Sequence, residues 1–393
     1  MSITFIVNPG SVSKRYALFN DRTPVIQFWF EHTDSGFEVR THTSKGLNEG
    51  SVISQEEYQS SFSRVATVVQ KYLKDNQSEL NSIAVRIVAP GKQFQTNQVI
   101  DDSFVFALRQ KEFSMPLHVP FILQEIQNIK QEFSNTKLIA ISDSAFHSTL
   151  PQRAREFSIN RSDAETYDIY RFGYHGLSVA SVIRRIHPVT GNNPSRIVVC
   201  HVGGGVSVTA VKDGKSVETS MGYSSSSGLP MGSQAGDIDP GGLLELMRAK
   251  NLKPSEAGMY IHSKGGLFGL AETSDIRHLL DGRARGDAIA SQTLDLFIYH
   301  IQKQIAASTV ALGGLDMLVL TGTACTRSSE LRLLLGKGLE YLGVTFDEDR
   351  NDVLVGQDGV CSTQKSEVKV ATIRTDEMGE MANAVDILKL SQT

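Results

Sequence analysis

Two stretches that lie far apart in the chain carry the same succession of short apolar runs and tight turns. In residues 3–32 the order is ITFIVN, the turn PGSVSK, RYALFN, the turn DRT and PVIQFWFEH. In residues 196–222 the order is RIVVCHV, the turn GGG, VSVTAV, the turn KDGK and SVETSMG. Each stretch predicts a three-stranded meander, and the Asp-Gly pair in KDGK is typical of a type I′ hairpin turn. The recurrence favours a duplicated α/β domain whose two glycine-containing turns face each other across a cleft.

Helical patterns occupy much of the remaining chain. Residues 55–75 and 287–312 carry apolar side chains at helical spacing, and Gly313-Gly314 ends the second of these helices. The apolar strands predicted at 138–142 and 317–322 each follow helical material, as α/β units require. The turn-rich segment 153–168 is the expected crossover between the two halves.

Bulk composition narrows the class of function. The 393 residues suffice for two domains, and 43 acidic against 39 Lys and Arg residues give a net charge of -4, which argues against a general nucleic-acid binder. The three cysteines are far apart and suggest neither a zinc site nor a disulfide framework. The sequence shows no secretion signal and no apolar run of membrane-spanning length, so we expect a cytoplasmic protein without membrane or nucleic-acid partners.

Polar residues gather where predicted strands end. The turn NPGSVSK, residues 8–14, could present backbone N–H groups and hydroxyls to an anion, or be an ordinary hairpin. Asp143 follows the strand at 138–142 and could hold Mg²⁺ or cap a helix. His175, in RFGYHG, could face a site or be structural. The three glycines at 203–205 follow a strand directly, which is typical of a phosphate-binding turn.

The order of these short blocks carries more information than any one of them. NxGSxS, SDSAFH, GYHGLS, HVGGG, SMG…GDIDP, GGLFGL…TSDIR and LTG, in this sequence from about residue 3 to about 388, resemble the acetate kinase family of carboxylate kinases. The resemblance implies two duplicated RNase H-like α/β domains of the actin, Hsp70 and sugar-kinase type, flanking a cleft. It places the first domain at 1–150, completed by a returning helix at 378–393, and the nucleotide-binding and dimerisation domain at 151–377.

The same resemblance implies an activity. It is the reversible transfer of a phosphoryl group between ATP and a short carboxylate, of the acetate or propionate type, to give an acyl phosphate. Mg²⁺ is the implied cofactor, ATP the co-substrate, and a homodimer the implied assembly.

Matching positions carry implied roles. The implied catalytic residues are Arg86, Asp143, His175 and the position held by Gln234. The implied substrate contacts are Asn8, Ser11, Ser13, Val88, Leu117, Tyr174 and Ser225, with Asn8 and Glu377 at the metal. The implied nucleotide contacts are His201, Gly203, Gly204, Gly205, Asp275, Arg277, Gly322 and Thr323.

The sequence also departs from the family pattern. In the stretch from Met221 to Pro240, Gln234 stands where the family has a catalytic arginine, so a neutral amide replaces a permanent charge. The glycine-rich adenosine loop of the family reads TACTRS at 323–328. In the acyl pocket, Tyr174 and Ser225 add hydroxyls where the family has Phe and Pro, which suggests a larger or more polar carboxylate unless the backbone takes up those hydroxyls.

These departures leave three readings open. The leading hypothesis is a divergent carboxylate kinase with altered acyl specificity. The alternative is a catalytically impaired paralogue that binds a nucleotide or acyl phosphate and serves as a regulatory subunit. A third reading is transfer from pyrophosphate or another nucleoside triphosphate.

Overall fold

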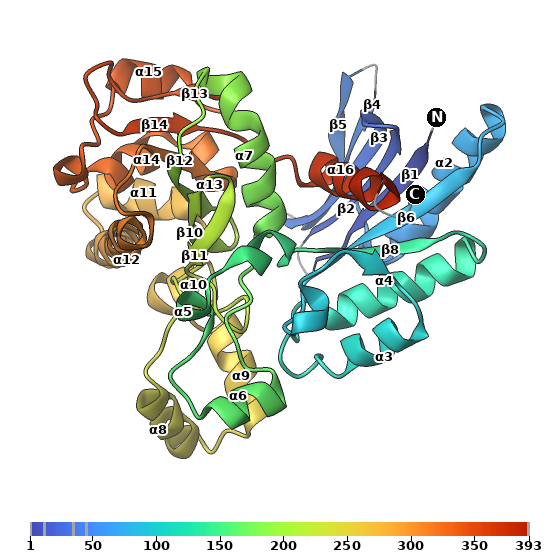
Figure 1. Cartoon of the computed structure of the whole chain (residues 1–393), viewed down its shortest axis with the longest axis horizontal. Helices are drawn as coiled ribbons and strands as arrows, with labels where there is room; N and C mark the ends of the chain where they lie inside the picture. Colours follow the sequence, from blue (N-terminus) through green and yellow to red (C-terminus); the bar gives the residue numbers. More distant parts are fainter. Residues whose placement is uncertain (1, 11–12, 34–35, 44–45, 391–393) are drawn as a thin grey trace. The chain divides into compact units, whose positions relative to one another are not determined.

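The computed structural model describes residues 2–10, 13–33, 36–43 and 46–390. The chain divides into two compact units, which we call unit 1 (residues 1–145 with 377–393) and unit 2 (residues 146–376). Figure 1 shows α16, late in the chain, among the early strands of unit 1. The predicted α/β class is confirmed, with one mixed sheet in each unit.

The sheet of unit 1 has the strand order β5-β4-β3-β2-β1-β6-β8-β7. Its strands are β1 Ile3–Asn8, β2 Ser13–Asn20, β3 Thr23–Thr33, β4 Gly36–Thr43, β5 Gly46–Ile53, β6 Leu80–Ile87, β7 Gln98–Val99 and β8 Leu138–Ser142. The first five strands form an antiparallel meander, and β1, β6 and β8 run parallel. The carboxyl ends of these three parallel strands therefore meet at one edge of the sheet.

The sheet of unit 2 has the order β11-β10-β9-β12-β14-β13. Its strands are β9 Arg196–Val202, β10 Val206–Lys212, β11 Lys215–Thr219, β12 Met317–Thr321, β13 Gly359–Val360 and β14 Lys369–Thr372. Here too a meander leads into three parallel strands, β9, β12 and β14, with a short antiparallel strand beyond them. The two sheets share this plan, as the recurrent meanders predicted.

Helices cover both faces of the sheet in unit 1. They are α1 Gln55–Gln59, α2 Ser61–Asp75, α3 Asp102–Arg109, α4 Val119–Glu132 and α16 Glu377–Leu390. On one face, Phe5 and Tyr16 of the sheet pack against Phe62 of α2 and against Phe133 at the end of α4. On the other face, α16 lies against β1, β6 and β8.

The helix predicted over 55–75 is divided in the structure. Ser54 and Glu57 form a capping box that starts α1, and α2 begins at Ser61. The hydroxyl of Ser60 donates to the carbonyl of Glu56, 2.8 Å away. A side chain that bonds to the preceding turn in this way competes with the regular helical pattern, and apolar periodicity alone does not reveal it.

The helices of unit 2 are more numerous. They are α5 Gln152–Arg155, α6 Arg161–Tyr167, α7 Gly176–Thr190, α8 Pro240–Lys250, α9 Pro254–Ser263, α10 Gly266–Ala271, α11 Ile276–Ala284, α12 Ala288–Leu312, α13 Gly322–Arg327, α14 Ser329–Gly336 and α15 Glu348–Val353. Val179, Val182 and Ile186 of α7 pack in one core with β9, β12 and β14, and α12 lies against β9, β10 and β11. As predicted, α12 ends at Gly313 in the left-handed conformation.

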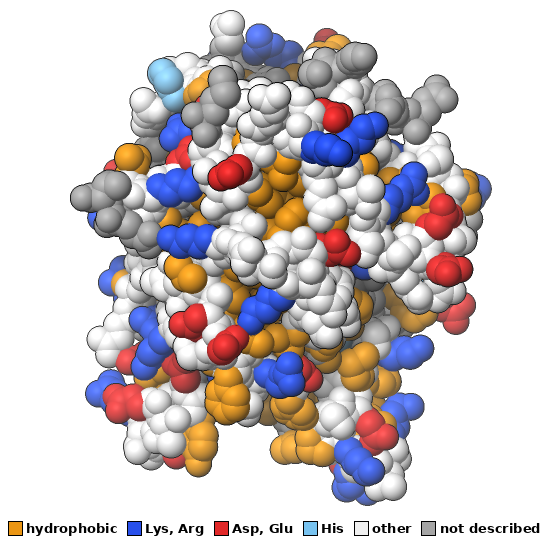
Figure 2. All heavy atoms as spheres, turned by 90° about the vertical axis from the view of Figure 1, so that its right-hand side faces the viewer, with side chains coloured by type: hydrophobic (Ala, Val, Ile, Leu, Met, Phe, Trp, Pro, Cys, Tyr) orange, Lys and Arg blue, Asp and Glu red, His pale blue; other side chains and the backbone are white. Residues whose placement is uncertain are grey.

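The surface is mixed in charge where Figure 2 shows it. Lys and Arg side chains alternate with Asp and Glu over that face, so the side chains drawn in colour form no broad field of one sign. Among the described helices, none is both long and apolar enough to cross a membrane.

Candidate active site

Four predicted site residues of unit 1 meet at one edge of its sheet. Asn8 is the last residue of β1, Arg86 lies near the end of β6, and Asp143 directly follows β8. Because β1, β6 and β8 are parallel, their ends bring these three side chains together. Glu377, the first residue of α16, joins them from more than 230 positions further along the chain.

Arg86 is the centre of this group. Its guanidinium lies 3.0 Å from Oδ2 of Asp143 and 3.3 Å from Oε2 of Glu377. It also donates to Oδ1 of Asn8 at 3.3 Å, and the amide of Asn8 donates to Oε2 of Glu377 at 3.3 Å. Two carboxylates, one amide and one guanidinium therefore form a single hydrogen-bonded network.

The electrostatics of the group follow from its burial. Asp143 is 1% exposed, while Arg86 and Glu377 keep 16% and 14%. Burial opposes the charge of Arg86, but Asp143 and Glu377 outweigh it and raise the pKa of the guanidinium above its ordinary value. Arg86 is therefore a permanent cation between two acidic side chains.

The donor set suits a hard divalent cation. Mg²⁺ is commonly held by one or two carboxylates, with waters and substrate phosphates completing its shell. Asp143 and Glu377 supply two carboxylates and Asn8 an amide oxygen, all within reach of Arg86. No group of three or more His, Cys, Asp or Glu gathers among the described residues, so the remaining ligands would be substrate and water.

The neighbouring turn of unit 1 is tight. A Cβ atom on Gly10 would lie 2.6 Å from the backbone oxygen of Ser13, so only glycine fits there. Ser13 begins β2, whereas Ser11 lies outside the described residues. Val88 is buried and Leu117 is half-buried, as apolar wall residues would be.

A second group forms in unit 2, at the corresponding edge of its sheet. β9 leads into the turn Gly203–Gly205 and its parallel neighbour β12 leads into Gly322 and Thr323. A Cβ on Gly203 would lie 3.7 Å from the backbone nitrogen of Thr323, so the two turns are adjacent. Gly322 has φ 84°, and a Cβ there would lie 2.4 Å from the carbonyl oxygen of Val202. The predicted glycine turn thus lies beside the start of α13, and the N–H of Gly203 closes it by donating to the carbonyl of Gly205 at 2.9 Å.

His175 lies against this glycine turn. It occupies the residue before α7 with φ 59° and ψ 19°, a left-handed conformation that is uncommon for residues other than glycine. Its Nδ1 lies 3.0 Å from Oγ of Ser207, and its ring lies 4.5 Å from that of His201, centroid to centroid. A Cβ on Gly205 would lie 2.9 Å from Nε2 of His175. The strained backbone and the Ser207 contact fix this imidazole, with Nε2 facing the turn.

Ser207 was missed from sequence. It lies directly opposite His201 in the β9–β10 register. The glycine turn between the two strands fixes that pairing, so a hairpin register assigned from the sequence would have pointed to it.

The stretch from Met221 to Pro240 is an ordered loop. Gly228 has φ 91° and Gly236 has φ 74°, and a Cβ at either would lie within 2.6 Å of backbone atoms. Gly228 also donates its N–H to Oδ1 of Asp237 at 2.7 Å. A Cβ on Gly232 would lie 3.6 Å from the carbonyl oxygen of Gly204, so this loop reaches the glycine turn.

Gln234 belongs to this loop and is half-buried. Its carbonyl accepts from the N–H of Met231 at 3.0 Å, which closes a turn next to Gly232. Arg171, a cation of the same unit, donates instead to the carbonyls of Ala154 and Ser220 and lies over the ring of Phe157. Its guanidinium is therefore engaged with the backbone that holds the start of the loop.

The two added hydroxyls differ in their surroundings. The hydroxyl of the buried Tyr174 donates to the carbonyl of Tyr223 at 2.6 Å, so a backbone acceptor satisfies this hydroxyl. The hydroxyl of Ser225 is buried without a hydrogen-bond partner among the described residues. Tyr174 and Ser225 belong to unit 2, whereas Val88 and Leu117 belong to unit 1.

The implied nucleoside contacts Asp275 and Arg277 are bonded to each other. Asp275 caps α11 by accepting from the N–H of Arg277, and the two side chains form an ion pair at 2.6 Å. The hydrogen bond from Arg277 lowers the pKa of Asp275 below its usual value. A Cβ on Gly232 would lie 3.3 Å from Cβ of Ser274, so this cap lies next to the ordered loop.

The segment 323–328, which the resemblance aligned with an adenosine loop, lies almost entirely in the helix α13. Cys325 and Thr326 are buried, and the fully buried Arg332 of α14 donates to the carbonyl of Cys325 at 2.6 Å. Arg332 also donates to Oδ1 and to the carbonyl of Asn351, at 2.7 and 2.6 Å. Arg332 was missed from sequence, because an arginine in an amphipathic helix normally predicts a solvated side chain.

The chain matches the Acetokinase family over residues 3–383. It is 36% identical to an acetate kinase of Azobacteroides pseudotrichonymphae over 316 residues, which cover 80% of this chain and 79% of that one. Its fold is similar to that of the acetate kinase of Porphyromonas gingivalis, with a TM-score of 0.82 and 26% identity over 99% and 100% of the two chains. It is also similar to a propionate kinase of Francisella tularensis, with a TM-score of 0.84 and 25% identity over 98% and 99%.

Proposed function

The chain belongs to the Acetokinase family, and we propose that it transfers a phosphoryl group between a nucleoside triphosphate and a short carboxylate to form an acyl phosphate. A carboxylate oxygen attacks the γ-phosphorus, and the bond from that phosphorus to the β–γ bridging oxygen breaks. The nucleoside diphosphate leaves with that bridging oxygen. Because the transition state is loose, the residues act mainly by positioning and by neutralising oxygen charge.

The network around Arg86 is the observation that carries this function. A permanent guanidinium beside two carboxylates and an amide can bind the acceptor carboxylate or the phosphoryl oxygens through Arg86. Asp143, Glu377 and Asn8 would hold Mg²⁺, which when bound neutralises phosphate charge. Asn8 and Ser13 are the proposed contacts to the transferred group in unit 1, together with Ser11, and Val88 and Leu117 would contact the acyl chain.

The residues of unit 2 have complementary roles. His175, held by Ser207, would donate a hydrogen bond from Nε2 to a phosphoryl oxygen. The N–H groups of Gly204 and Gly205 would donate hydrogen bonds to the nucleotide phosphates, and Gly203, whose N–H bonds to the carbonyl of Gly205, would shape the turn beside them. His201, Gly322, Thr323, Asp275 and Arg277 are the proposed neighbours of the nucleotide, and Tyr174 and Ser225 of the acyl group.

Acyl phosphate formation is the direct test. We expect hydroxamate in a hydroxylamine trap when the protein is incubated with Mg²⁺, a carboxylate from acetate to longer and hydroxylated acids, and ATP. GTP and pyrophosphate serve as alternative donors, and removal of Mg²⁺ with EDTA is expected to abolish the signal. No hydroxamate from any donor and acceptor pair at high enzyme concentration contradicts the kinase function.

A second candidate function is that of a ligand-binding subunit with little turnover. Two observations favour it: Gln234 replaces the family arginine, and α13, held by Arg332, replaces the glycine-rich adenosine loop. Calorimetric titration with ATP, ADP and acetyl phosphate separates the two functions. Binding without hydroxamate formation identifies the subunit, and binding with turnover identifies the kinase.

We further propose that the protein acts in the cytoplasm as a homodimer formed through unit 2. Exposed apolar side chains on α8 to α12 support this, among them Leu244, Met259, Phe268, Ile289 and Tyr299. Light scattering is expected to give twice the 43.0 kDa chain mass, and Tyr299→Asp is expected to give the monomer. A wild-type protein that remains monomeric at high concentration contradicts the dimer.

A further inference from the structure

A cavity in unit 2 lies at the other end of the strands that lead to the glycine turn. It has a volume of about 450 Å³, within the range of small-ligand sites. Met317 and Lys369, the first residues of β12 and β14, are part of its lining. The phosphate-binding turns follow the last residues of β9 and β12, so this cavity is separate from the residues assigned to phosphoryl transfer.

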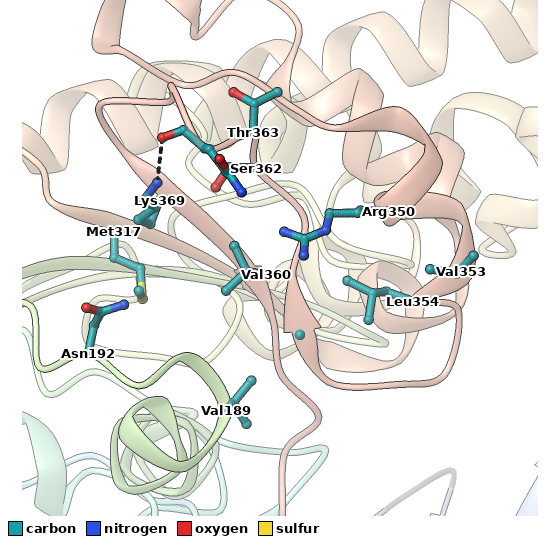
Figure 3. A pocket seen from close by; sticks show the side chains of 12 residues that line it. Val189, Asn192, Met317, Arg350, Val353, Leu354, Val360, Ser362, Thr363 and Lys369 are labelled. Carbon is teal, nitrogen blue, oxygen red and sulfur yellow. Dashed lines mark hydrogen bonds between the residues drawn. The ribbon is translucent and has the colours of Figure 1, made fainter.

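The polar side of the cavity is cationic. Arg350 of α15 and Lys369 belong to its lining, and no Asp or Glu does among the described residues. Figure 3 shows the guanidinium of Arg350 pointing from α15 into the cavity toward Val360. Lys369 donates to the carbonyl of Gln364 at 3.2 Å, and Arg350, a solvent-exposed residue, has no ion pair among the described residues. A positive charge thus faces the cavity without a protein counter-charge in the lining.

A buried hydroxyl adds a second polar feature. Oγ1 of Thr363, another lining residue, is buried and has no hydrogen-bond partner among the described residues. A buried hydroxyl without a partner is unfavourable unless a water or a ligand bonds to it. Thr363 therefore adds a hydrogen-bonding hydroxyl to the lining that also holds the two cations.

The rest of the lining combines the polar residues Asn192, Ser362 and Gln364 with a group of apolar side chains. Val189, Met317, Val353, Leu354 and Val360 contribute side chains to the cavity wall (Figure 3). Free phosphate would leave this surface in contact with water, whereas an organic body would cover it. The lining thus matches a ligand with one anionic group and an apolar body.

We propose that this cavity binds a small organic anion, a phosphate monoester or a carboxylate, through Arg350, Lys369 and Thr363. The apolar wall binds the body of the ligand, and Arg350 supplies the counter-charge. A phosphate and a carboxylate both accept charge-assisted hydrogen bonds from these donors. Two probe molecules, one with each headgroup, distinguish the two.

Calorimetric titration with phenyl phosphate, phenylacetate and neutral benzyl alcohol tests the site. We expect one or both anions to bind, and benzyl alcohol to bind at least about tenfold more weakly, since the charge-assisted contact is absent. The tighter of the two anions identifies the headgroup. Equal affinity for benzyl alcohol and the anions, or no binding of either anion, overturns the proposal.

Two variants then locate the binding. Arg350→Ala removes the charge, and Val360→Trp fills the cavity without changing charge; each is expected to weaken anion binding at least about tenfold. Lys365→Ala is the matched control, because Lys365 is an exposed cation nearby that does not line the cavity. Circular dichroism confirms folding of each variant. Anion binding that is indifferent to both Arg350→Ala and Val360→Trp places the ligand elsewhere and overturns the proposal.

Discussion

At position 234 the loop next to the glycine turn presents a neutral amide, although its backbone is fixed by required glycines on both sides. Arginines that stabilise a phosphoryl transition state contribute roughly 10³–10⁵ in rate. Arg171 is bonded to backbone carbonyls in this structure and does not supply that charge. The amide at this position is therefore expected to limit turnover.

Gln234→Arg is expected to raise the kcat of acyl phosphate formation by at least about tenfold, a small part of what such an arginine can contribute. The hydroxamate assay with ATP and acetate or propionate measures it. Gln131→Arg, which adds the same charge to an exposed position of α4, is the control. If Gln234→Arg leaves kcat at the wild-type value, the amide is not what limits the rate.

Glu125 of α4 makes the stability of unit 1 depend on pH. Its carboxylate is 2% exposed, lies 3.4 Å from Nζ of Lys14, and accepts from the hydroxyl of Tyr16 at 3.0 Å. Burial raises the pKa of Glu125 above its usual value, and the contacts with Lys14 and Tyr16 only partly oppose this. The folded protein therefore holds the proton more tightly than the unfolded chain. The resulting stabilisation is fully present below the unfolded pKa, about 4.3, and is lost as pH rises through the folded pKa.

Glu125→Gln is expected to remove this loss. The free energy of unfolding of the variant, minus that of the wild type, should increase from pH 4 to pH 8. Urea unfolding followed by the fluorescence of Trp29 measures it, because Trp29 is the one tryptophan of the chain and lies in β3 of unit 1. Glu132→Gln, on the exposed side of the same helix, is expected to show no such trend. A difference that stays constant with pH would falsify the role of Glu125.

At the scale of elements, α13, α14 and α15 are joined by one buried side chain. Arg332 bonds to the carbonyl of Cys325 in α13 and to both oxygens of Asn351 in α15. Burial lowers the pKa of its guanidinium, so these three acceptors compensate a costly charge. The segment next to Gly322 is therefore held as a helix.

Arg332→Met is expected to destabilise unit 2 by about 2–3 kcal/mol, because it leaves buried carbonyl groups without donors. Urea unfolding followed by circular dichroism measures the loss. Arg327→Met, at an exposed position of α13, is the matched control and should unfold like the wild type. Equal stability of the two variants would show that Arg332 is dispensable for holding α13.

The elements differ in how far the sequence predicts them. Local periodicity and turn chemistry predict the meanders at 3–32 and 196–222 and the helix that ends at Gly313. The order of the short sequence blocks along the chain predicts the family. The network of Arg86 with Asp143 and Glu377 joins residues brought together by parallel strands and a returning helix, and only the resemblance suggested it. The roles of Ser207 and Arg332 depend on strand register and helix packing, which no local pattern contains.

At the scale of the whole molecule, unit 1 is completed by a helix from beyond unit 2. Met381 and Val385 of α16 are fully buried, and α16 lies against β1, β6 and β8. A chain that stops at Asp376 lacks both this packing and Glu377. It would leave one face of the sheet uncovered.

Truncation after Asp376 is expected to abolish the cooperative thermal transition reported by Trp29 while circular dichroism still shows a transition of unit 2. Truncation after Leu390 is the control, because it keeps α16 entire. A truncated chain whose Trp29 transition stays within a few degrees of the full chain would show that unit 1 folds without α16.

The late position of Glu377 also orders events during synthesis. A ribosome translates residues 146–376 after the sheet strands of unit 1 and before α16. Through that interval the nascent unit 1 exposes the apolar face that α16 covers. Arg86 then has Asp143 but not Glu377, so a nascent chain holds an incomplete site. The group around Arg86 is therefore complete only when translation has passed the second unit.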